Sequence, residues 1–333
     1  MKRIAVSWRR GFLPCLASAS LACIGLFPLA AAAQTYPSKP LRLIIPYAPG
    51  GGNDIFGRMA AQKLGEALGQ NVITENRAGD GGVLGSAIVA KAPPDGYTML
   101  LGHIGTLALN VTLRPELPYD PVKGFQPVTL LAKVPNILVV HPSLPVQSLK
   151  DLIALAKRSP GALTYGSGGV GSTGHLSAEY FKQVANVDML HVPYKGTGPA
   201  LVELMGGQIA TVFAGAAGIS PLVQSGKLRA IGVSSRKRLS IFPEVPTIAE
   251  GGLRDFEVTT WFGLVMPAGV PLPIAIRLSE ILQKALHAKD MQKSFVALGA
   301  EPATSTPEEF GAFIRAEISR WAVVLKAANL KTD

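Results

Sequence analysis

Two glycine-rich segments hold the residues best placed for binding chemistry. They are 47–54 (YAPGGGND) and 166–175 (GSGGVGSTGH), and each lies between a predicted strand and a predicted helix. Glycine lets a ligand approach backbone N–H groups closely, and the first turn of a helix offers unpaired N–H donors with a partial positive charge. Each segment therefore predicts an anion site, although glycine more often serves a tight turn.

The second segment also contains a G-x-G-x-x-G pattern at Gly166, Gly168 and Gly171, with Asp188 about twenty residues on, where a ribose-binding acid would stand in a dinucleotide fold. We set that interpretation aside because the motif lies mid-chain, without a complete six-stranded nucleotide domain around it. A phosphate-loop lysine motif is also missing from the sequence.

Signals of catalysis are weak. No serine has the G-x-S-x-G spacing, and the histidines lack the close spacing of a metal site. The histidines are His103, His141, His175, His191 and His287. We interpret His175 and His191 as structural or cleft-lining residues, because no nucleophile motif supports a catalytic role.

Asp54 needs its own explanation, since a carboxylate beside an anion site would repel the ligand. We expect it to offset the dipole of the first helix and to tie down the loop. The pattern predicts this helix over 54–69, with Asn53 as the N-cap and Gly69 as the C-terminal stop.

The elements that position these segments alternate between strands and helices, which is typical of an α/β fold with largely parallel sheets. The predicted strands are 41–46, 97–102, 163–166, 189–193, 209–214 and 228–234. The predicted helices are 54–69, 82–92, 147–158, 173–185, 197–206, 271–288, 291–298 and 307–328.

Two long apolar runs, 130–142 and 258–268, are expected to cross between lobes. Paired crossings imply that a second lobe is inserted into the first, and such a hinge creates a cleft. We therefore expect lobe 1 to comprise 34–137 and 262–333, and lobe 2 to comprise 138–261.

The N-terminal 33 residues have the pattern of a cleaved secretory signal peptide, with four basic residues, an apolar stretch and Ala31-Ala32-Ala33. A membrane anchor is the alternative, but Pro14, Gly25 and Pro28 interrupt the apolar stretch. Cleavage lowers the net charge from +10 to +6 and removes both cysteines, which suits an oxidising compartment. The basic residues are dispersed and only 7% of residues are aromatic, so nucleic-acid binding is not expected.

Several motifs follow one another in the order of a known family. They are 36–42 (YPSKPLR), 47–54, 75–82 (ENRAGDGG), 94–98 (PDGYT), 117–121 (LPYDP), 166–175, 191–196 (HVPYKG), Pro246-Thr247, Trp261 and 267–269 (PAG). Across the whole predicted mature chain, the sequence resembles the Bug family of substrate-binding proteins, the extracytoplasmic receptors of tripartite tricarboxylate transporters.

The resemblance implies a two-lobed periplasmic binding protein fold of type II-like topology, each lobe a mixed, mostly parallel sheet flanked by helices. It also implies a monomeric periplasmic receptor, without enzymatic activity, metal or cofactor, that binds a small organic acid and serves a membrane permease. A sensor subunit that reports to a membrane kinase would need the same cleft, and an exported hydrolase is a remote alternative.

In the family, both glycine loops clamp a ligand carboxylate through backbone N–H groups and ordered water. Carried over, the ligand-binding residues are Tyr47, Gly51, Gly52, Asn53, Ser167, Gly168, Ser172 and Thr173, with His103 and Thr106 selecting the rest of the ligand. The stretch 213–218, including Ala214 and Gly215, is expected to line the cleft from lobe 2.

That stretch offers no acid to pair with an ammonium group, and a buried unpaired charge is costly. We therefore expect a mono- or dicarboxylate or an aromatic acid without an ammonium group. Lys195 has two interpretations: it contacts a second carboxylate, or it anchors its loop by pairing with a group outside the site.

Overall fold

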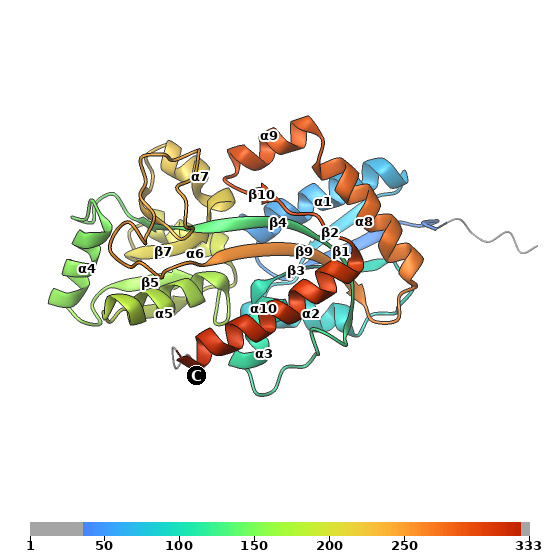
Figure 1. Cartoon of the computed structure of the whole chain (residues 1–333), viewed down its shortest axis with the longest axis horizontal. Coiled ribbons are helices and arrows are strands. Elements are labelled where there is room, and N and C mark those ends of the chain that lie inside the picture. Colours follow the sequence, from blue (N-terminus) through green and yellow to red (C-terminus); the bar gives the residue numbers. More distant parts are fainter. Residues whose placement is uncertain (1–35, 328–333) are drawn as a thin grey trace, which may run out of the picture. The chain divides into compact units, whose positions relative to one another are not determined.

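The computed structural model describes residues 36–327, so the predicted signal peptide lies outside the described residues. A ten-stranded mixed sheet, with helices packed against it, organises this part of the chain (Figure 1). Its strands run in the order β2-β1-β3-β9-β4-β7-β5-β6, with β8 and β10 also paired to β4.

The N-terminal portion contributes a parallel set of strands in which β1 lies between β2 and β3. The strands are β1 (Leu41–Ile45), β2 (Val72–Asn76) and β3 (Thr98–His103), and the helices are α1 (Gly52–Leu68), α2 (Val83–Ala90) and α3 (Asn110–Leu113). A 3-10 turn at Asp80–Gly82 precedes α2, and a π-helical turn at Gly105–Leu109 joins β3 to α3. The apolar run of β1 is almost wholly buried, which explains its central place.

Two long antiparallel strands, β4 (Phe125–Val140) and β9 (Thr259–Pro267), connect this set to the rest of the sheet (Figure 1). Up to Pro135, β4 pairs with β9 and with β10 (Glu301–Pro302). From Asn136 onward, β4 pairs with β7 and then also with β8. The predicted crossings at 130–142 and 258–268 thus correspond to this ribbon of two strands.

The middle portion repeats the α/β pattern, with β5 parallel to both β6 and β7. Its strands are β5 (Thr164–Ser167), β6 (Leu190–Pro193), β7 (Thr211–Gly215) and β8 (Arg229–Val233). Its helices are α4 (Leu149–Arg158), α5 (Thr173–Ala185), α6 (Thr197–Met205) and α7 (Ala216–Gln224). The glycine-rich segment 166–175 therefore joins β5 to α5.

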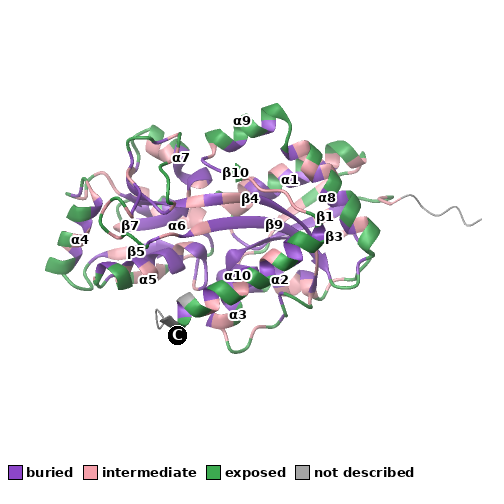
Figure 2. Ribbon diagram, in the orientation of Figure 1, coloured by how far each residue is buried: buried purple, intermediate pink, exposed green. Residues whose placement is uncertain are grey.

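The C-terminal helices return to the first strands. They are α8 (Leu272–Leu286), α9 (Lys289–Ala297) and α10 (Pro307–Ala327). Both α8 and α10 pack on β4, and the indole nitrogens of Trp261 and Trp321 donate to the buried Glu317 of α10 at 2.8 and 3.0 Å. The strands are mostly buried while the outer helix faces are exposed (Figure 2).

The structure adds elements that the sequence patterns did not predict, among them β2, β10, α7 and the helical turns at 105–113. Strand β2 reads VITEN and its residues are only half-buried or exposed, so it lacks an alternating pattern. Helix α7 contains Pro221, which normally argues against a helix interior. No helix within residues 36–327 combines the length and the apolar character needed to cross a membrane.

Candidate functional site

The first glycine-rich segment forms the loop between β1 and α1. Gly50 has a φ of 90°, in the region that favours glycine. A methyl group on Gly52 would lie 3.0 Å from Cζ of Phe262, so this backbone lies directly against an aromatic ring of β9. The helix begins at Gly52, and the predicted N-cap at Asn53 is wrong because the extended Gly51 occupies that position. Gly69 ends the helix in the left-handed conformation, as predicted.

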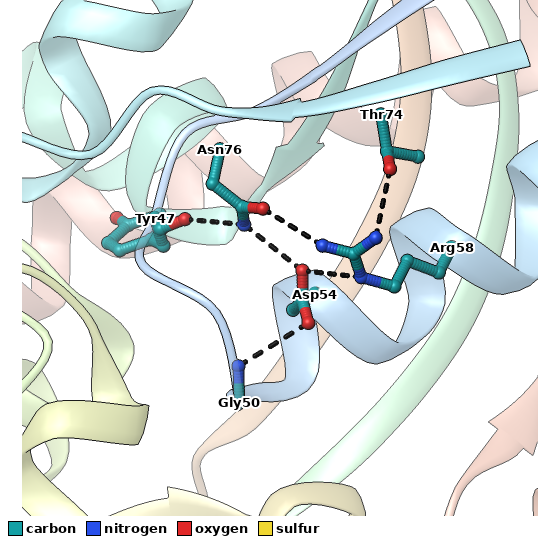
Figure 3. Close-up of polar contacts among 6 residues, drawn as sticks. All are labelled: Tyr47, Gly50, Asp54, Arg58, Thr74 and Asn76. Carbon is teal, nitrogen blue, oxygen red and sulfur yellow. Dashed lines mark hydrogen bonds and ion pairs between the residues drawn. The ribbon is translucent and has the colours of Figure 1, made fainter.

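Asp54 ties this loop to the neighbouring strand (Figure 3). Its carboxylate accepts hydrogen bonds from Arg58 Nε at 3.0 Å, from Asn76 Nδ2 at 3.0 Å and from the backbone of Gly50 at 3.4 Å. Asn76 also donates to the carbonyl of Tyr47 at 2.9 Å. Burial by itself would raise the pKa of Asp54, but the hydrogen bonds outweigh it and the pKa is lowered. The expectation that Asp54 ties down the loop is confirmed.

The second segment forms the loop between β5 and α5. Gly169 and Gly171 have φ of 109° and 79°, which other residues resist. Ser172 is the N-cap of α5, and its hydroxyl accepts from the backbone N–H of His175 at 3.3 Å. The helix therefore begins with its N–H groups directed toward the loop, which is the arrangement that suits an anion.

Three stacked aromatic rings pack beside this second loop. Tyr165, His191 and His175 lie in a stack, with centroids 4.7 Å apart for the first pair and 4.4 Å for the second. Burial lowers the pKa of His191 to about 4, with a smaller contribution from His175. Ser167 Oγ lies 2.7 Å from His191 Nε2, but Ser167 is fully buried, so this serine–histidine pair is closed to a substrate. The pair fits a structural role better than the nucleophile that a hydrolase would need.

The two loops meet segments from opposite ends of the sheet. The backbone N–H of Ala48 donates to the carbonyl of Lys195 at 2.9 Å. A methyl group on Gly81 would lie 2.0 Å from the carbonyl oxygen of Val170, and Arg114 Nη2 donates to the same oxygen at 3.4 Å. These two hydrogen bonds, and the close approach of Gly81 to Val170, join the walls of the site around a small interior.

That interior is a cavity of about 40 Å³, which we call the loop cavity. The residues that line it come from both loops, from the ends of β3 and β7, from the start of α6 and from the β4–β9 ribbon. They are Tyr47, Gly52, Asn53, His103, Asn136, Ser172, Thr173, Gly174, Thr197, Phe213, Ala214, Gly215, Thr260 and Phe262.

Most of the predicted site residues thus meet at one place, and five do not line the loop cavity. Gly51 and Gly168 pack against Thr197 instead. The Thr106 hydroxyl bonds to the backbone of His103, accepting from its N–H and donating to its carbonyl at 3.2 Å. Ser167 is hydrogen-bonded to His191 of the ring stack.

Lys195 is exposed and contributes its backbone carbonyl to the contact with Ala48. Neither expected role of its side chain, contact with the ligand or pairing outside the site, is seen: the residue does not line the loop cavity. Its side chain makes no hydrogen bond or ion pair with residues 36–327.

Sequence reasoning missed the part of the cavity wall built by the ribbon. The cavity is lined here by Asn136 of β4 and by Thr260 and Phe262 of β9, whose side chains alternate along the strand with ones on the opposite face. Thr260 donates to Asn136 Oδ1 at 3.0 Å. Asn136 in turn donates to Ser177 at 2.8 Å. The predicted crossings contained this signal, because a strand that crosses beneath a cleft must direct alternate side chains into it.

The loop cavity has no charged side chain in its lining. Burial lowers the pKa of His103 to about 3, so its imidazole is neutral at ordinary pH. Burial also raises the pKa of Tyr47 well above its usual range, and the Tyr47 hydroxyl donates to the carbonyl of Gly81 at 2.5 Å. The site therefore offers neutral polar groups and helix N-termini, including those of α1 and α5.

A metal site is not evident in the described part of the chain, where no three histidine, cysteine, aspartate or glutamate residues gather to hold an ion.

A larger hollow of about 420 Å³ lies on the other face of the ribbon. Lys133 and Pro135 of β4 and Thr259 and Trp261 of β9 contribute to its wall. We call it the ribbon hollow.

Comparison with known proteins agrees with this architecture. Residues 56–330 match the family described as tripartite tricarboxylate transporter family receptor. Protein BugT of Bordetella pertussis is 38% identical over 318 residues, which cover 93% of this chain and 98% of BugT.

Two structures solved with bound organic acids also resemble it. A protein of R. palustris solved with adipate is 36% identical, with a TM-score of 0.87, over 89% of this chain and all of that one. MatC of Rhodopseudomonas palustris with bound malate is 33% identical, with a TM-score of 0.83, over 87% of this chain and all of MatC. The two-lobed α/β periplasmic binding protein fold is confirmed by these neighbours and by a solved periplasmic transporter 39% identical to this chain. The chain belongs to the receptor family of tripartite tricarboxylate transporters, the Bug family that its motifs indicated.

Proposed function

We propose that this protein is a periplasmic receptor that captures a small organic carboxylate in the loop cavity and delivers it to a permease of the tripartite tricarboxylate type. The observation that carries the proposal is the meeting of two helix N-termini, those of α1 and α5, at one cavity without charged side chains. Backbone N–H groups and the helix dipoles there favour a carboxylate. Relatives solved with adipate and malate support the same chemistry.

Capture proceeds by closure of two lobes, which we assign to 34–137 with 262–333 and to 138–261. The change in pairing partners of β4 between Pro135 and Asn136 supports a boundary at this point. A carboxylate held between the two loops has more partners in the closed form, so its differential affinity shifts the population toward closure. The permease recognises the closed shape.

The remaining parts of the proposal follow from this role. Residues 1–33 direct export and are removed, and the receptor acts in the periplasm as a monomer without metal, cofactor or catalysis. The ligand has no ammonium group, because the wall formed by Phe213, Ala214 and Gly215 contains no acid to pair with one.

A ligand screen tests the proposal. Thermal unfolding of the purified protein is followed with adipate, malate, benzoate and glutamate, and hits are titrated calorimetrically. Ligand at about 100 times its Kd adds roughly 2.7 kcal/mol of stability, so the melting temperature should rise with at least one acid and not with glutamate. A chain that no carboxylate stabilises would contradict the proposal. Loss of uptake of the bound acid on deletion of this gene, with the permease intact, tests delivery.

A further inference from the structure

His103 occupies a position of unusual constraint beside the loop cavity. It is the last residue of β3, and the π-helical turn Gly105–Leu109 follows almost at once. The residue is 2% exposed, and its ring packs against Tyr47 at a centroid distance of 4.8 Å and against Phe262 at 6.3 Å. Isolated π-helical turns commonly occur at functional sites, and here the turn determines the surroundings of one ring nitrogen.

The backbone N–H of Gly105 donates to His103 Nδ1 at 2.6 Å. A backbone N–H can only donate, so Nδ1 must be the acceptor and carries no proton. Burial holds the ring neutral, with a lowered pKa. A neutral imidazole has one N–H, and it must therefore be at Nε2.

The Nε2 atom has no hydrogen-bond partner among residues 36–327. Some polar atoms, such as Asn53 Oδ1, lack a partner and are completely buried. His103 Nε2 is not among them, so part of this atom remains accessible. Because His103 lines the loop cavity and is otherwise buried, we infer that the accessible Nε2–H faces the cavity. The donor is thus available to a bound molecule.

Two hydroxyl groups of the cavity lining already donate to other atoms of the protein. Tyr47 donates to the carbonyl of Gly81 and Thr260 donates to Asn136. No carboxylate lines the cavity. A ligand atom facing His103 therefore meets an N–H group, and a ligand ammonium would find neither an anion nor a free nitrogen lone pair.

We propose that His103 is a tautomer-locked, uncharged hydrogen-bond donor that selects carboxylates with a second acceptor group, such as another carboxylate, a carbonyl or a hydroxyl oxygen. This inference rests on the proposed carboxylate-binding function. It assigns the specificity for the second polar group of the ligand to one residue, and it predicts discrimination against amino acids whose ammonium would face this nitrogen.

Two complementary substitutions separate binding from structure. His103→Asn places an amide oxygen where Nδ1 accepts from Gly105, but it lacks the donor at the Nε2 position. His103→Gln can present an amide N–H near the Nε2 position and does not reproduce the Nδ1 acceptor. A structural role predicts that Asn is tolerated better than Gln, whereas a ligand-donor role predicts the reverse order in affinity.

The test measures Kd by calorimetry for adipate and malate, with hexanoate as an acid that lacks the second acceptor, and the melting temperature without ligand. For the diacid that binds wild type, His103→Asn should weaken binding about 10- to 100-fold, the effect of losing a hydrogen bond to a charged group. His103→Gln should retain most of the affinity, and hexanoate should lose little in either variant. His141→Leu, at a half-buried histidine whose ring contacts Ser143 and does not line the loop cavity, is the matched control.

The pH dependence gives an independent readout. Tyr47 and His103 are the titratable side chains in the cavity lining, and neither changes charge between pH 5.5 and 8 if burial shifts them as described. The ratio of wild-type to His103→Asn affinity should stay constant over that range. Tighter binding to wild type at pH 5.5 would mean an imidazolium and overturn the inference.

Failure of the inference is distinguishable from failure of the proposed function. If wild type binds a diacid and both variants bind it equally well, His103 is not the selecting donor while the receptor function stands. If Asn retains affinity and Gln loses it, the role of His103 is structural. If wild type binds no carboxylate at all, the proposed function fails, and the inference fails with it.

Discussion

Trp261 and Phe262 are neighbours on β9, yet Phe262 lines the loop cavity and Trp261 lines the ribbon hollow on the opposite face. The antiparallel register pairs Lys133 with Trp261 and Val134 with Thr260. Because side chains alternate along a strand, the two hollows share the β4–β9 ribbon as a common wall. Ser235 and Phe313 of α10 also line the ribbon hollow.

This shared wall predicts coupling between the two faces. If the lobes pivot at the ribbon, closure of the loop cavity widens the ribbon hollow, so a bulky side chain there should oppose reopening. Ser235→Trp is expected to lower the ligand Kd several-fold by raising the closed fraction of the free protein. Calorimetry measures the affinity, and small-angle scattering measures the closed fraction.

The matched control is Ser225→Trp, at an exposed serine that follows α7 and does not border the hollow. It should leave both quantities unchanged. An unaltered or higher Kd in Ser235→Trp would argue against a pivot at the ribbon.

Gly81→Ala should obstruct closure without unfolding the protein. Its added methyl group would lie 2.0 Å from the carbonyl oxygen of Val170, across the contact between the walls. The matched control is Gly207→Ala, because Gly207 has a φ of 69°, close to the 59° of Gly81, and open space around it. Both variants carry backbone strain of about 1–2 kcal/mol.

Only Gly81→Ala should also weaken binding, by at least about tenfold, if relieving the clash costs the closed form ~1.4 kcal/mol or more. Calorimetry compares the two variants with wild type. Equal affinities for both would show that this contact plays no part in capture.

Ser172→Ala removes the N-cap of α5 at the loop cavity, whereas Ser148→Ala removes the N-cap of α4 outside it. Each side chain accepts a hydrogen bond from a backbone N–H three residues on. The free energy of unfolding should fall by about 1 kcal/mol in each variant, as measured by urea titration. Binding should weaken in Ser172→Ala alone, and comparable loss in both would indicate a general effect of stability.

Asp54→Asn tests the anchoring of the first loop. The folded pKa of Asp54 is lowered from 3.8 because the hydrogen bonds from Arg58, Asn76 and Gly50 outweigh the effect of burial. The carboxylate therefore stabilises the fold above pH 3.8, and this contribution is lost as the pH falls through the lower folded pKa. The variant should melt at a lower temperature than wild type at pH 7, with the difference shrinking toward pH 3.

Glu66→Gln serves as the control for Asp54→Asn, because Glu66 lies on the same helix and pairs with Lys63 at 3.0 Å on the surface. Exposed pairs of this kind contribute little. A pH-independent deficit in Asp54→Asn would show that the lost charge is not the cause.

Local patterns predicted the local parts of the site. Gly50, Gly169 and Gly171 do adopt positive φ, and α5 spans Thr173–Ala185 as predicted. Asp54 was correctly expected to hold its loop, since its partner Gly50 lies four residues away. Such features depend on neighbours in the chain, so residue type and spacing suffice to predict them.

Other features depended on pairings that the chain makes over long distances. Strand β2 was missed because its residues are only half-buried or exposed and its place is set by parallel pairing with β1. The cap of α1 is Gly51, two residues before the predicted Asn53. His103 was expected at the cleft, but which nitrogen faces the ligand depends on the N–H of Gly105.

The amino-acid sequence by itself determined the α/β class, the two glycine loops and the family, because these follow from local geometry and from an ordered set of motifs. Only the tertiary structure decided that Asn136, Thr260 and Phe262 complete the cavity while Lys195 lies outside it. The reason is physical: a shift of one residue in strand register exchanges the two faces of a strand, and the register of β4 against β9 is set by packing across more than a hundred residues of chain.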